Sequence, residues 1–226
     1  MQTNKLRASA VAWILLVPLF MGLLFVGNSQ AIDPPELDET SWMKGIIDSD
    51  SEVSNDISVA IDQNGYLHVS YYDMLGQDLL YATNSDGTWR TEIVDSVGIV
   101  GRQNSIGVDS TGKVHISYYD HSNQDLKYAT GTFGSWDLET IDSIGVVGEY
   151  NSLVCVGNTV HIVYLDYSNY TVKHAQGNAG TWTLEIAAED VNPGSSLVAS
   201  DGKLFAAFIS EDNKLYCAVK DNTTWS

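Results

Sequence analysis

Short strings of alternating side chains recur along the chain and define its hydrophobic pattern. HVSYYD, HISYYD and HIVYLD occupy residues 68–73, 115–120 and 161–166. In the second string Ile116 and Tyr118 form an apolar set, while the alternate set, His115, Ser117 and Tyr119, mixes polar and aromatic side chains. Because successive strand residues point to opposite faces, the pattern predicts β-strands that are partly buried on both faces.

These strings belong to a longer repeat. The string HISYYD lies in one copy, LKYAT follows it at residues 126–130, and each later tryptophan follows Gly-Thr, Gly-Ser or Thr-Thr. The fourth copy is less regular and has FAAFIS from Phe205. A fixed period of between 40 and 50 residues is typical of tandem modules that need their neighbours for stability. The tryptophans that mark the period, separated by 47, 47, 46 and 43 residues, are Trp42, Trp89, Trp136, Trp182 and Trp225.

One copy contains four predicted strands, at residues 105–109, 113–120, 125–130 and 136–142. The Asp-Ser-Thr-Gly turn after the first strand and the glycine turn before the fourth are hairpin signals. No segment has a useful length of helical periodicity. The pattern therefore predicts an all-β protein, a β-propeller built from four-stranded blades of about 46–47 residues, with four blades in this chain.

The pattern also divides the chain into segments. Lys5 and Arg7 precede an apolar run over residues 10–27, and small residues around Ala31 resemble a signal peptidase site. An uncleaved anchor is the alternative, since the apolar run is long. The expected segments are a signal peptide at 1–31, an acidic linker at 32–41, and repeats at 42–226 with blades at about 42–88, 89–135, 136–181 and 182–226.

The last copy raises the question of closure. The sequence ends at Trp225 and Ser226, so the fourth inner triplet is expected to lack its own outer strand. A strand at 42–47 would supply it in a closed four-bladed ring. The alternative is that these are four blades of a larger propeller.

Composition narrows the function. The formal net charge is −18, which excludes a nucleic-acid partner because phosphate binding needs clustered Lys and Arg. Such acidity favours solubility or cation binding. Cys155 and Cys217 fall at core positions of non-equivalent strands, and we expect two buried thiols, although an exported pair can also form a bridge.

Loops that leave one face of a propeller are the expected ligand-binding region. Two carboxylates across a tight hairpin, such as Asp73 and Asp78, have the chemistry to hold Ca²⁺ or orient sugar hydroxyls. The alternative is that each Asp caps its own turn. No other cofactor is expected. The candidate ligand-binding residues are Asp73, Asp78, Arg102, Asp120, His121, Asp125, Glu149, Tyr150 and Asp166.

Three histidines occupy the same position in successive copies of the repeat, but this pattern does not predict a metal site. His68, His115 and His161 hold equivalent positions in successive blades, so they should lie blade widths apart, whereas zinc needs ligands around one ion. We expect each imidazole to bond a neighbouring strand or turn. No motif places a nucleophile beside a base, so no catalytic residue is assigned.

The terminal Gly-[Ser/Thr]-Trp and the strings HISYYD and LKYAT resemble tandem propeller repeats of secreted prokaryotic surface proteins and, more distantly, sialidase-type propellers. Sialidase-type blades carry an Asp-box, Ser-x-Asp-x-Gly-x-x-Trp, and Ser-Asp-Gly-Thr-Trp at residues 85–89 is too short to match it. The repeats also contain only Arg90 and Arg102, whereas such an enzyme uses a cluster of arginines to bind a carboxylate substrate. Both departures argue against sialidase activity. The expected function is non-catalytic recognition of carbohydrate or a surface protein outside the cytoplasm, with no membrane contact beyond the leader. The alternatives are a degenerate glycoside hydrolase or lyase domain and a structural spacer.

Overall fold

The computed structural model describes residues 45–221 and 223–226. The predicted leader and linker lie outside these residues. Sixteen strands form four antiparallel sheets, each in simple chain order. The first sheet contains β1 (Val53–Ile61), β2 (Leu67–Asp73), β3 (Asp78–Thr83) and β4 (Arg90–Asp95); the second contains β5 (Val100–Val108), β6 (Val114–Asp120), β7 (Asp125–Thr132) and β8 (Ser135–Asp142). The third contains β9 (Val147–Val156), β10 (Thr159–Asp166), β11 (Thr171–Asn178) and β12 (Thr181–Ala188); the fourth contains β13 (Val191–Ser200), β14 (Lys203–Ser210), β15 (Leu215–Asp221) and β16 (Thr224–Trp225).

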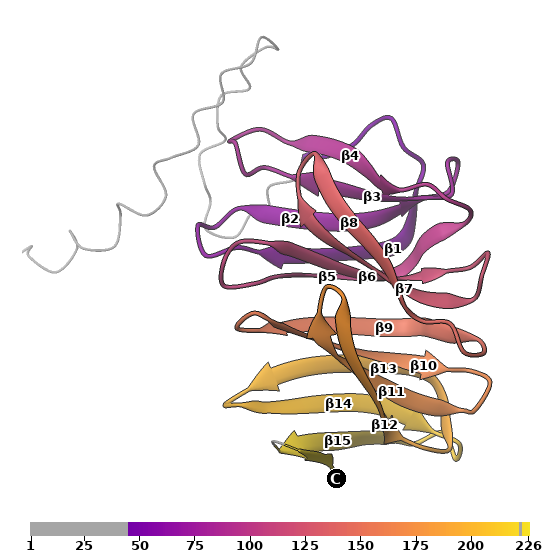
Figure 1. Cartoon of the computed structure of the whole chain (residues 1–226). Helices are drawn as coiled ribbons and strands as arrows, with labels where there is room; N and C mark the ends of the chain where they lie inside the picture. The colour runs from indigo at the N-terminus through magenta and orange to yellow at the C-terminus, as the bar shows by residue number, and fades with distance from the viewer. Residues whose placement is uncertain (1–44, 222) are drawn as a thin grey trace, which may run out of the picture. The chain divides into compact units, whose positions relative to one another are not determined.

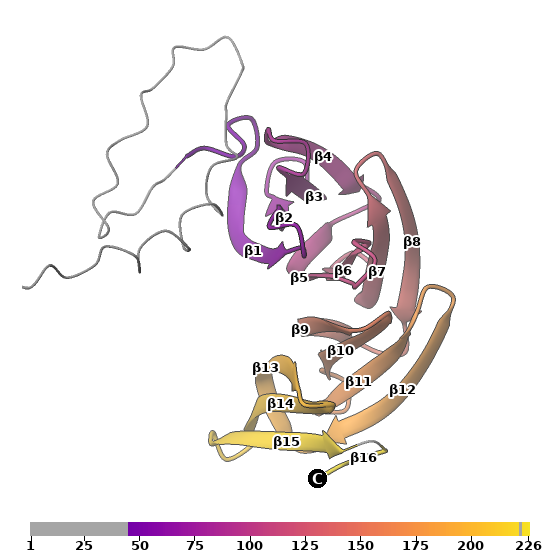
Figure 2. The same cartoon turned by 90° about the vertical axis from the view of Figure 1, so that its left-hand side faces the viewer.

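The four sheets follow one another along an arc (Figures 1 and 2). Strands β1, β5, β9 and β13 lie on its inner side, and β4, β8 and β12 lie on its outer side. Three of the four core clusters take side chains from two neighbouring sheets: in one of them, Leu79 and Tyr81 of the first sheet pack with Ile116 and Tyr118 of the second. This radial arrangement confirms the predicted β-propeller with four blades.

In the first three sheets the second strand is buried on both faces, as the pattern of side chains predicted. All seven residues of β6 are buried, including His115, Ser117 and Asp120. A blade that packs against a neighbour on each side has no solvent face in its middle strands, so its polar side chains must find partners inside the protein.

Two sets of polar contacts join neighbouring sheets. On the inner strands, a serine hydroxyl accepts from a backbone N–H of the next sheet, as Ser105 Oγ does from Leu153 N at 2.9 Å. Toward the outer strands, the carboxylate of Asp95 accepts from the Tyr118 hydroxyl at 2.7 Å and pairs with the Lys127 ammonium at 2.5 Å. Asp142 repeats this arrangement one sheet later. These contacts fix the position of each sheet relative to its neighbour.

The sheets are offset from the repeat units of the sequence. Trp89 directly precedes β4, and the second residue of β8, β12 and β16 is a tryptophan, so these outer strands complete the sheet of the preceding triplet, as β4 does by pairing with β3. The expectation about the fourth triplet was wrong, because β16 pairs with β15 through Lys220 and Trp225. Gly45–Ile47 lie outside strands, and residues 42–44 lie outside the described part.

Both cysteines are free thiols, which agrees with the prediction of no bridge. Cys155 is half-buried, but Cys217 is exposed, so its predicted burial was wrong. Cys217 lies on β15, opposite Ala207 of β14, in the fourth sheet, and Figure 2 shows this sheet at one end of the arc, with the third sheet on one side of it.

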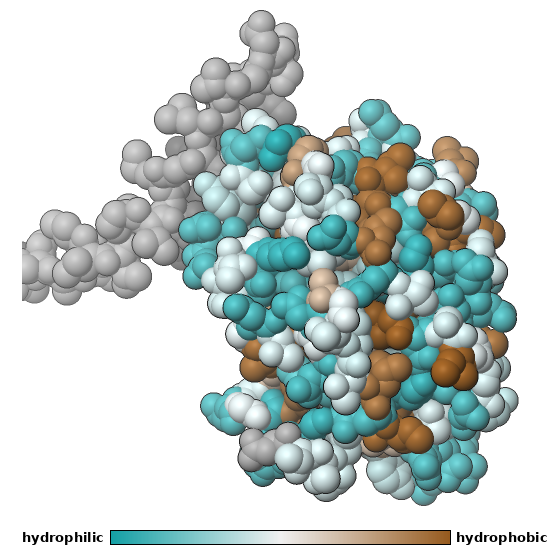
Figure 3. Space-filling model, viewed as in Figure 1, coloured by the Kyte–Doolittle hydropathy of each residue, from teal (hydrophilic) through white to brown (hydrophobic). Residues whose placement is uncertain are grey.

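The visible surface is mixed in character. Figure 3 shows apolar side chains as separate brown patches among hydrophilic ones, some of them over the outer strands. Leu138 on β8 and Ile186 on β12 contribute to this exposed apolar surface. In the described part of the chain, no helix has the length and hydropathy that crossing a membrane requires.

Candidate functional site

One end of the arc gathers the hairpins and connections that were expected to form a binding face. The connection that enters β5 bonds to the β2–β3 hairpin through Val100 N and Gln77 O at 3.0 Å. It also bonds to the β6–β7 hairpin of its own sheet, because His121 N donates to Ile99 O at 2.9 Å. The predicted clustering of these loops is therefore present in the structure.

The aspartates at the start of these hairpins are occupied by their own turns. Asp73 accepts from the N–H of Gly76 at 2.9 Å, Asp120 from the N–H of Asn123 at 3.0 Å, and Asp166 from that of Asn169 at 3.1 Å. Asp120 and Asp166 also accept from the amides of these asparagines at 2.9 Å. Turn capping accounts for all three carboxylates.

The second members of the Asp pairs have raised pKa values. Burial and the neighbouring carboxylates of Asp73 and Asp95 raise the pKa of Asp78. Burial, Asp120 and Asp142 do the same for Asp125. No group of three or more possible metal ligands occurs among the described residues, so the geometry gives no support to a Ca²⁺ site at these hairpins.

The remaining predicted residues line the junctions between sheets. The guanidinium of Arg102 on β5 lies 5.4 Å from the centre of the Tyr72 ring of the first sheet. Glu149 on β9 lies near Tyr119 of the second sheet, and its negative charge contributes, after burial, to the raised pKa of Tyr119. His121 packs edge-on against Tyr119 at 5.9 Å, and Tyr150 is 39% exposed.

A groove opens on this face between the third and fourth sheets. Its volume is about 310 Å³, and its lining comes from the β10–β11 hairpin, the β12–β13 connection and the β14–β15 hairpin. The residues that line it are Asn169, Tyr170, Asp190, Val191, Asn192 and Glu211.

The groove exists because one connection is short. The connections before β5 and β9 span residues 96–99 and 143–146, whereas the one before β13 spans only 189–190. In the longer connections Ile99 N and Val146 N donate to Ser122 Oγ and Ser168 Oγ of the following hairpins, both at 2.8 Å, and the two-residue connection makes no such bond in the described part of the chain. Sequence analysis missed this site, although the shortened spacing from Trp182 to Trp225 was a signal.

Inside the blades, the histidines bond the neighbouring strand, as predicted. His68 Nδ1 lies 2.6 Å from the Tyr81 hydroxyl, and His115 Nδ1 lies 2.5 Å from that of Tyr128. His161 Nδ1 instead meets His174 Nε2 at 3.1 Å. The rings are separated by whole sheets and form no common metal centre in the described residues.

The sheets and their faces define the class: the described residues form four blades of a β-propeller. No protein-family model and no curated protein sequence matches the chain. Solved structures with a similar fold include a fungal lectin from Aleuria aurantia, a six-bladed β-propeller with a fucose recognition mode. It is 13% identical, the TM-score is 0.54, and the match covers 78% of this chain and 64% of the lectin.

Two enzymes have a comparable likeness. A Hadza microbial sialidase is 12% identical with a TM-score of 0.54, covering 76% of this chain and 45% of the enzyme. An exo-β-1,3-galactanase from Phanerochaete chrysosporium, solved with β-1,3-galactotriose, is 10% identical with a TM-score of 0.54, covering 76% and 48%. The chain thus spans between 45% and 64% of the length of these proteins. At such identities the likeness shows the fold alone.

Proposed function

We propose that this propeller binds carbohydrate without catalysis, and that the groove between the third and fourth sheets is its binding site. The observation that carries the proposal is the lining of that groove. An exposed tyrosine ring lies beside the amides of Asn169 and Asn192 and the carboxylates of Asp190 and Glu211. This mixture of one aromatic face with several hydrogen-bonding groups suits a sugar ring.

The groove has free hydrogen-bonding capacity. The Asn192 amide nitrogen donates to Ser210 O at 3.1 Å and to Asn213 Oδ1 at 3.1 Å, which fixes the side chain. Its carbonyl oxygen has no donor among the described residues and is available to accept from a hydroxyl. Sugar hydroxyls both donate and accept, so a site with fixed amides and carboxylates can orient them.

The backbone conformation of Tyr170 and a neighbouring ring fix the position of the aromatic side chain in the groove. Tyr170 is 51% exposed and has φ of 53°, and its carbonyl accepts from Val191 N at 3.0 Å. Tyr167 packs against it with ring centres 5.5 Å apart. The turn therefore presents a fixed ring face, against which the C–H face of a sugar can stack.

The similar solved structures support this proposal by analogy, since the lectin recognises fucose and the two enzymes carry glycosidase names. Recognition outside the cytoplasm is part of the proposal and depends on the leader predicted at residues 1–31. A glycoside hydrolase is the second candidate, because Asp190 and Glu211 bring two carboxylates to one groove.

A glycan array with the purified protein, followed by calorimetric titration of the best ligand, tests the proposal. Tyr170→Asn removes the ring while keeping a residue type that tolerates positive φ, and we expect at least a tenfold loss of affinity, about 1.4 kcal/mol. Tyr66→Ala is the control, since Tyr66 is 37% exposed in the β1–β2 connection at the other end of the sheets.

Two outcomes would contradict the proposal. If the array shows no glycan bound, or if both tyrosine variants bind equally well, the groove is not the site. Release of sugar from a panel of chromogenic glycosides, abolished by Glu211→Gln, would replace it with the hydrolase function.

A further inference from the structure

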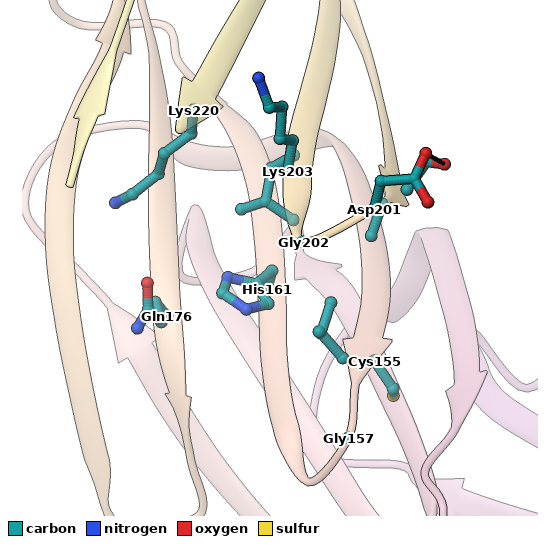
Figure 4. Close-up of a pocket in the computed structure, with 12 residues that line it drawn as sticks. Cys155, Gly157, His161, Gln176, Asp201, Gly202, Lys203 and Lys220 are labelled. Carbon is teal, nitrogen blue, oxygen red and sulfur yellow. Dashed lines mark hydrogen bonds between the residues drawn. The ribbon is translucent and has the colours of Figure 1, made fainter. Parts of the chain in front are cut away.

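A second pocket lies at the opposite end of the sheets, where the first and second strands of each sheet are connected. Its volume is about 460 Å³, and it lies between the third and fourth sheets (Figure 4). The β9–β10 turn at Gly157 and the β13–β14 turn at Asp201 and Gly202 form its rim. His161 lies at the centre of this view, with Gln176 on one side and Cys155 on the other.

The pocket exists because a turn is shorter in the third copy. In the first two sheets the connections at residues 62–66 and 109–113 begin with an aspartate. Asp109 accepts from Thr111 N and Lys113 N, and its other oxygen lies 3.2 Å from His115 Nε2. The third sheet has only a two-residue turn at 157–158, so no aspartate covers its histidine.

Neighbouring turns also close the earlier junctions. Gln63 donates to Ser110 O at 2.9 Å, and Ser110 Oγ donates to Asn158 Oδ1 at 2.7 Å. No such contact between Asn158 and the turn at 201–202 occurs in the part of the chain that the structure describes. The third junction therefore remains open to solvent.

The equivalent histidines of the second and third sheets, His115 and His161, carry their proton on different ring nitrogens. Asp109 faces His115 Nε2, so this nitrogen carries the proton and Nδ1 accepts from Tyr128. In the third sheet Glu185 lies 2.7 Å from His174 Nδ1, so that nitrogen donates and His174 Nε2 is an acceptor. His161 Nδ1 must then donate to His174 Nε2, which leaves the lone pair on His161 Nε2.

This lone pair lacks a partner inside the protein. His161 is 8% exposed and lines the pocket, and Nε2 has no hydrogen-bond donor among the described residues. Because this nitrogen faces the solvent in the pocket, a ligand that displaces the solvent must supply a hydrogen-bond donor in its place. A hydroxyl group meets this requirement, whereas an isolated carboxylate would be repelled.

The other lining groups suit the oxygens of the same ligand. Lys220 is 8% exposed and forms an ion pair with Glu185, and Lys203 pairs with Asp221 at 3.2 Å. With both ammonium groups paired and Asp201 on the rim, the pocket offers donors without a net positive charge. Its size lies within the usual range for small-molecule sites.

We propose that this pocket is a second binding site, which takes an uncharged polyhydroxylated ligand, a polyol or neutral sugar, whose hydroxyl donates to His161 Nε2. Lys220 and Gln176 would donate to its other oxygens. The site is separate from the groove at the other end of the sheets and does not depend on the function proposed for that groove.

Titration of the ¹⁵N-labelled protein with D-sorbitol tests the proposal, with gluconate and acetate as charged probes. We expect saturable sorbitol binding that shifts the His161 Nε2 resonance, at least tenfold weaker binding of both anions, and no such shift at His121. His161→Asn keeps an N–H near the Nδ1 position and removes Nε2, and we expect it to abolish binding. His121→Asn is the matched control.

The alternatives give different results. Gluconate that binds as well as sorbitol, or better, would show an anion site and overturn the proposal, as would no saturable shift with any probe. If His161→Asn does not fold, the wild-type tautomer decides: an Nε2 resonance of protonated type at neutral pH contradicts the proposed lone pair. Tyr170→Asn should leave sorbitol binding at His161 unchanged, which separates this site from the groove.

Discussion

The indole nitrogen of Trp182 donates a hydrogen bond of 2.9 Å to Glu139 Oε1, and so connects the outer strand of the third sheet to that of the second. The Trp182 ring also packs edge-on against Tyr128, with ring centres 5.0 Å apart. Trp136 makes the corresponding bond to Glu92 at 2.8 Å. The repeated tryptophan is thus a contact between adjacent sheets with a defined acceptor, in addition to an apolar side chain.

Trp182→Phe should destabilise the protein moderately. Phenylalanine keeps most of the apolar packing but cannot donate to Glu139, which among the described residues then retains only the bond from Gly180 N at 3.0 Å. We expect a loss of about 1.5 kcal/mol and a fall in Tm of roughly 3–6 °C for a domain of this size, measured by circular dichroism. Trp89→Phe is the control, because Trp89 packs against the core of the first sheet and makes no indole bond to a glutamate in the described residues.

Asp142→Asn should be more damaging. The buried Asp142 carboxylate accepts from the Tyr164 hydroxyl at 2.8 Å and pairs with the Lys173 ammonium. Neutralising it leaves a mostly buried ammonium without its main partner, so we expect a loss of about 3 kcal/mol. Urea unfolding checks this through a lower midpoint at unchanged slope. An exposed carboxylate serves for comparison: Asp137→Asn should change the free energy of unfolding by less than about 0.5 kcal/mol.

Gly148→Ala tests a close approach between sheets. Gly148 has φ of +102°, and a Cβ there would lie 2.7 Å from the Cα of Leu126 in the second sheet. Gly134 has φ of +85° but open space around it. We expect Gly134→Ala to cost about 1 kcal/mol from backbone strain and Gly148→Ala at least about 3 kcal/mol, because the backbone must also move. Equal Tm values for the two variants would show that the junction tolerates the added methyl group.

The buried histidines predict a loss of stability in mild acid. Burial, together with the charges of His174 and Lys220, lowers the pKa of His161 from 6.5 to about 4. Below pH 6.5 the unfolded chain therefore binds a proton that the folded protein does not, and folding becomes weaker as pH falls toward 4. For His161 alone the loss at pH 5 is about 2 kcal/mol. Denaturant unfolding at pH 7 and pH 5 checks this, and the difference should be smaller in His161→Asn.

The architecture could be predicted because each local signal agreed with the whole fold. Four-stranded units were predicted from the turn at Gly112, from the strand around Ile116 with apolar residues on both faces, and from the period of the tryptophans. The structure has these units. The outer strand of the fourth sheet was missed because β16 is only two residues long, Thr224–Trp225, at the very end of the sequence. Burial of Cys217 was wrong because a repeat position predicts burial only where a neighbouring sheet covers it.

The candidate sites were harder to predict. The aspartates of the hairpins were predicted to bind a ligand, yet the Asp120 carboxylate accepts its hydrogen bonds from within its own turn. A sequence cannot show which carboxylates have free hydrogen-bonding capacity. Both pockets arise from missing residues, at 157–158 and 189–190, rather than from a motif. The replacement of Tyr128 by His174 in the third copy was visible, but its effect on the tautomer of His161 depends on Glu185, which only the sheet register brings within reach.

The contacts at Glu139, Asp142 and Ser105 each join a sheet to the one beside it, and none of them reaches further. The chain therefore behaves as a linear array in which the free energy of folding is a sum of nearest-neighbour couplings. Opening should spread from sheet to sheet, and amide protons of β6 and β10, with couplings on both sides, should exchange last.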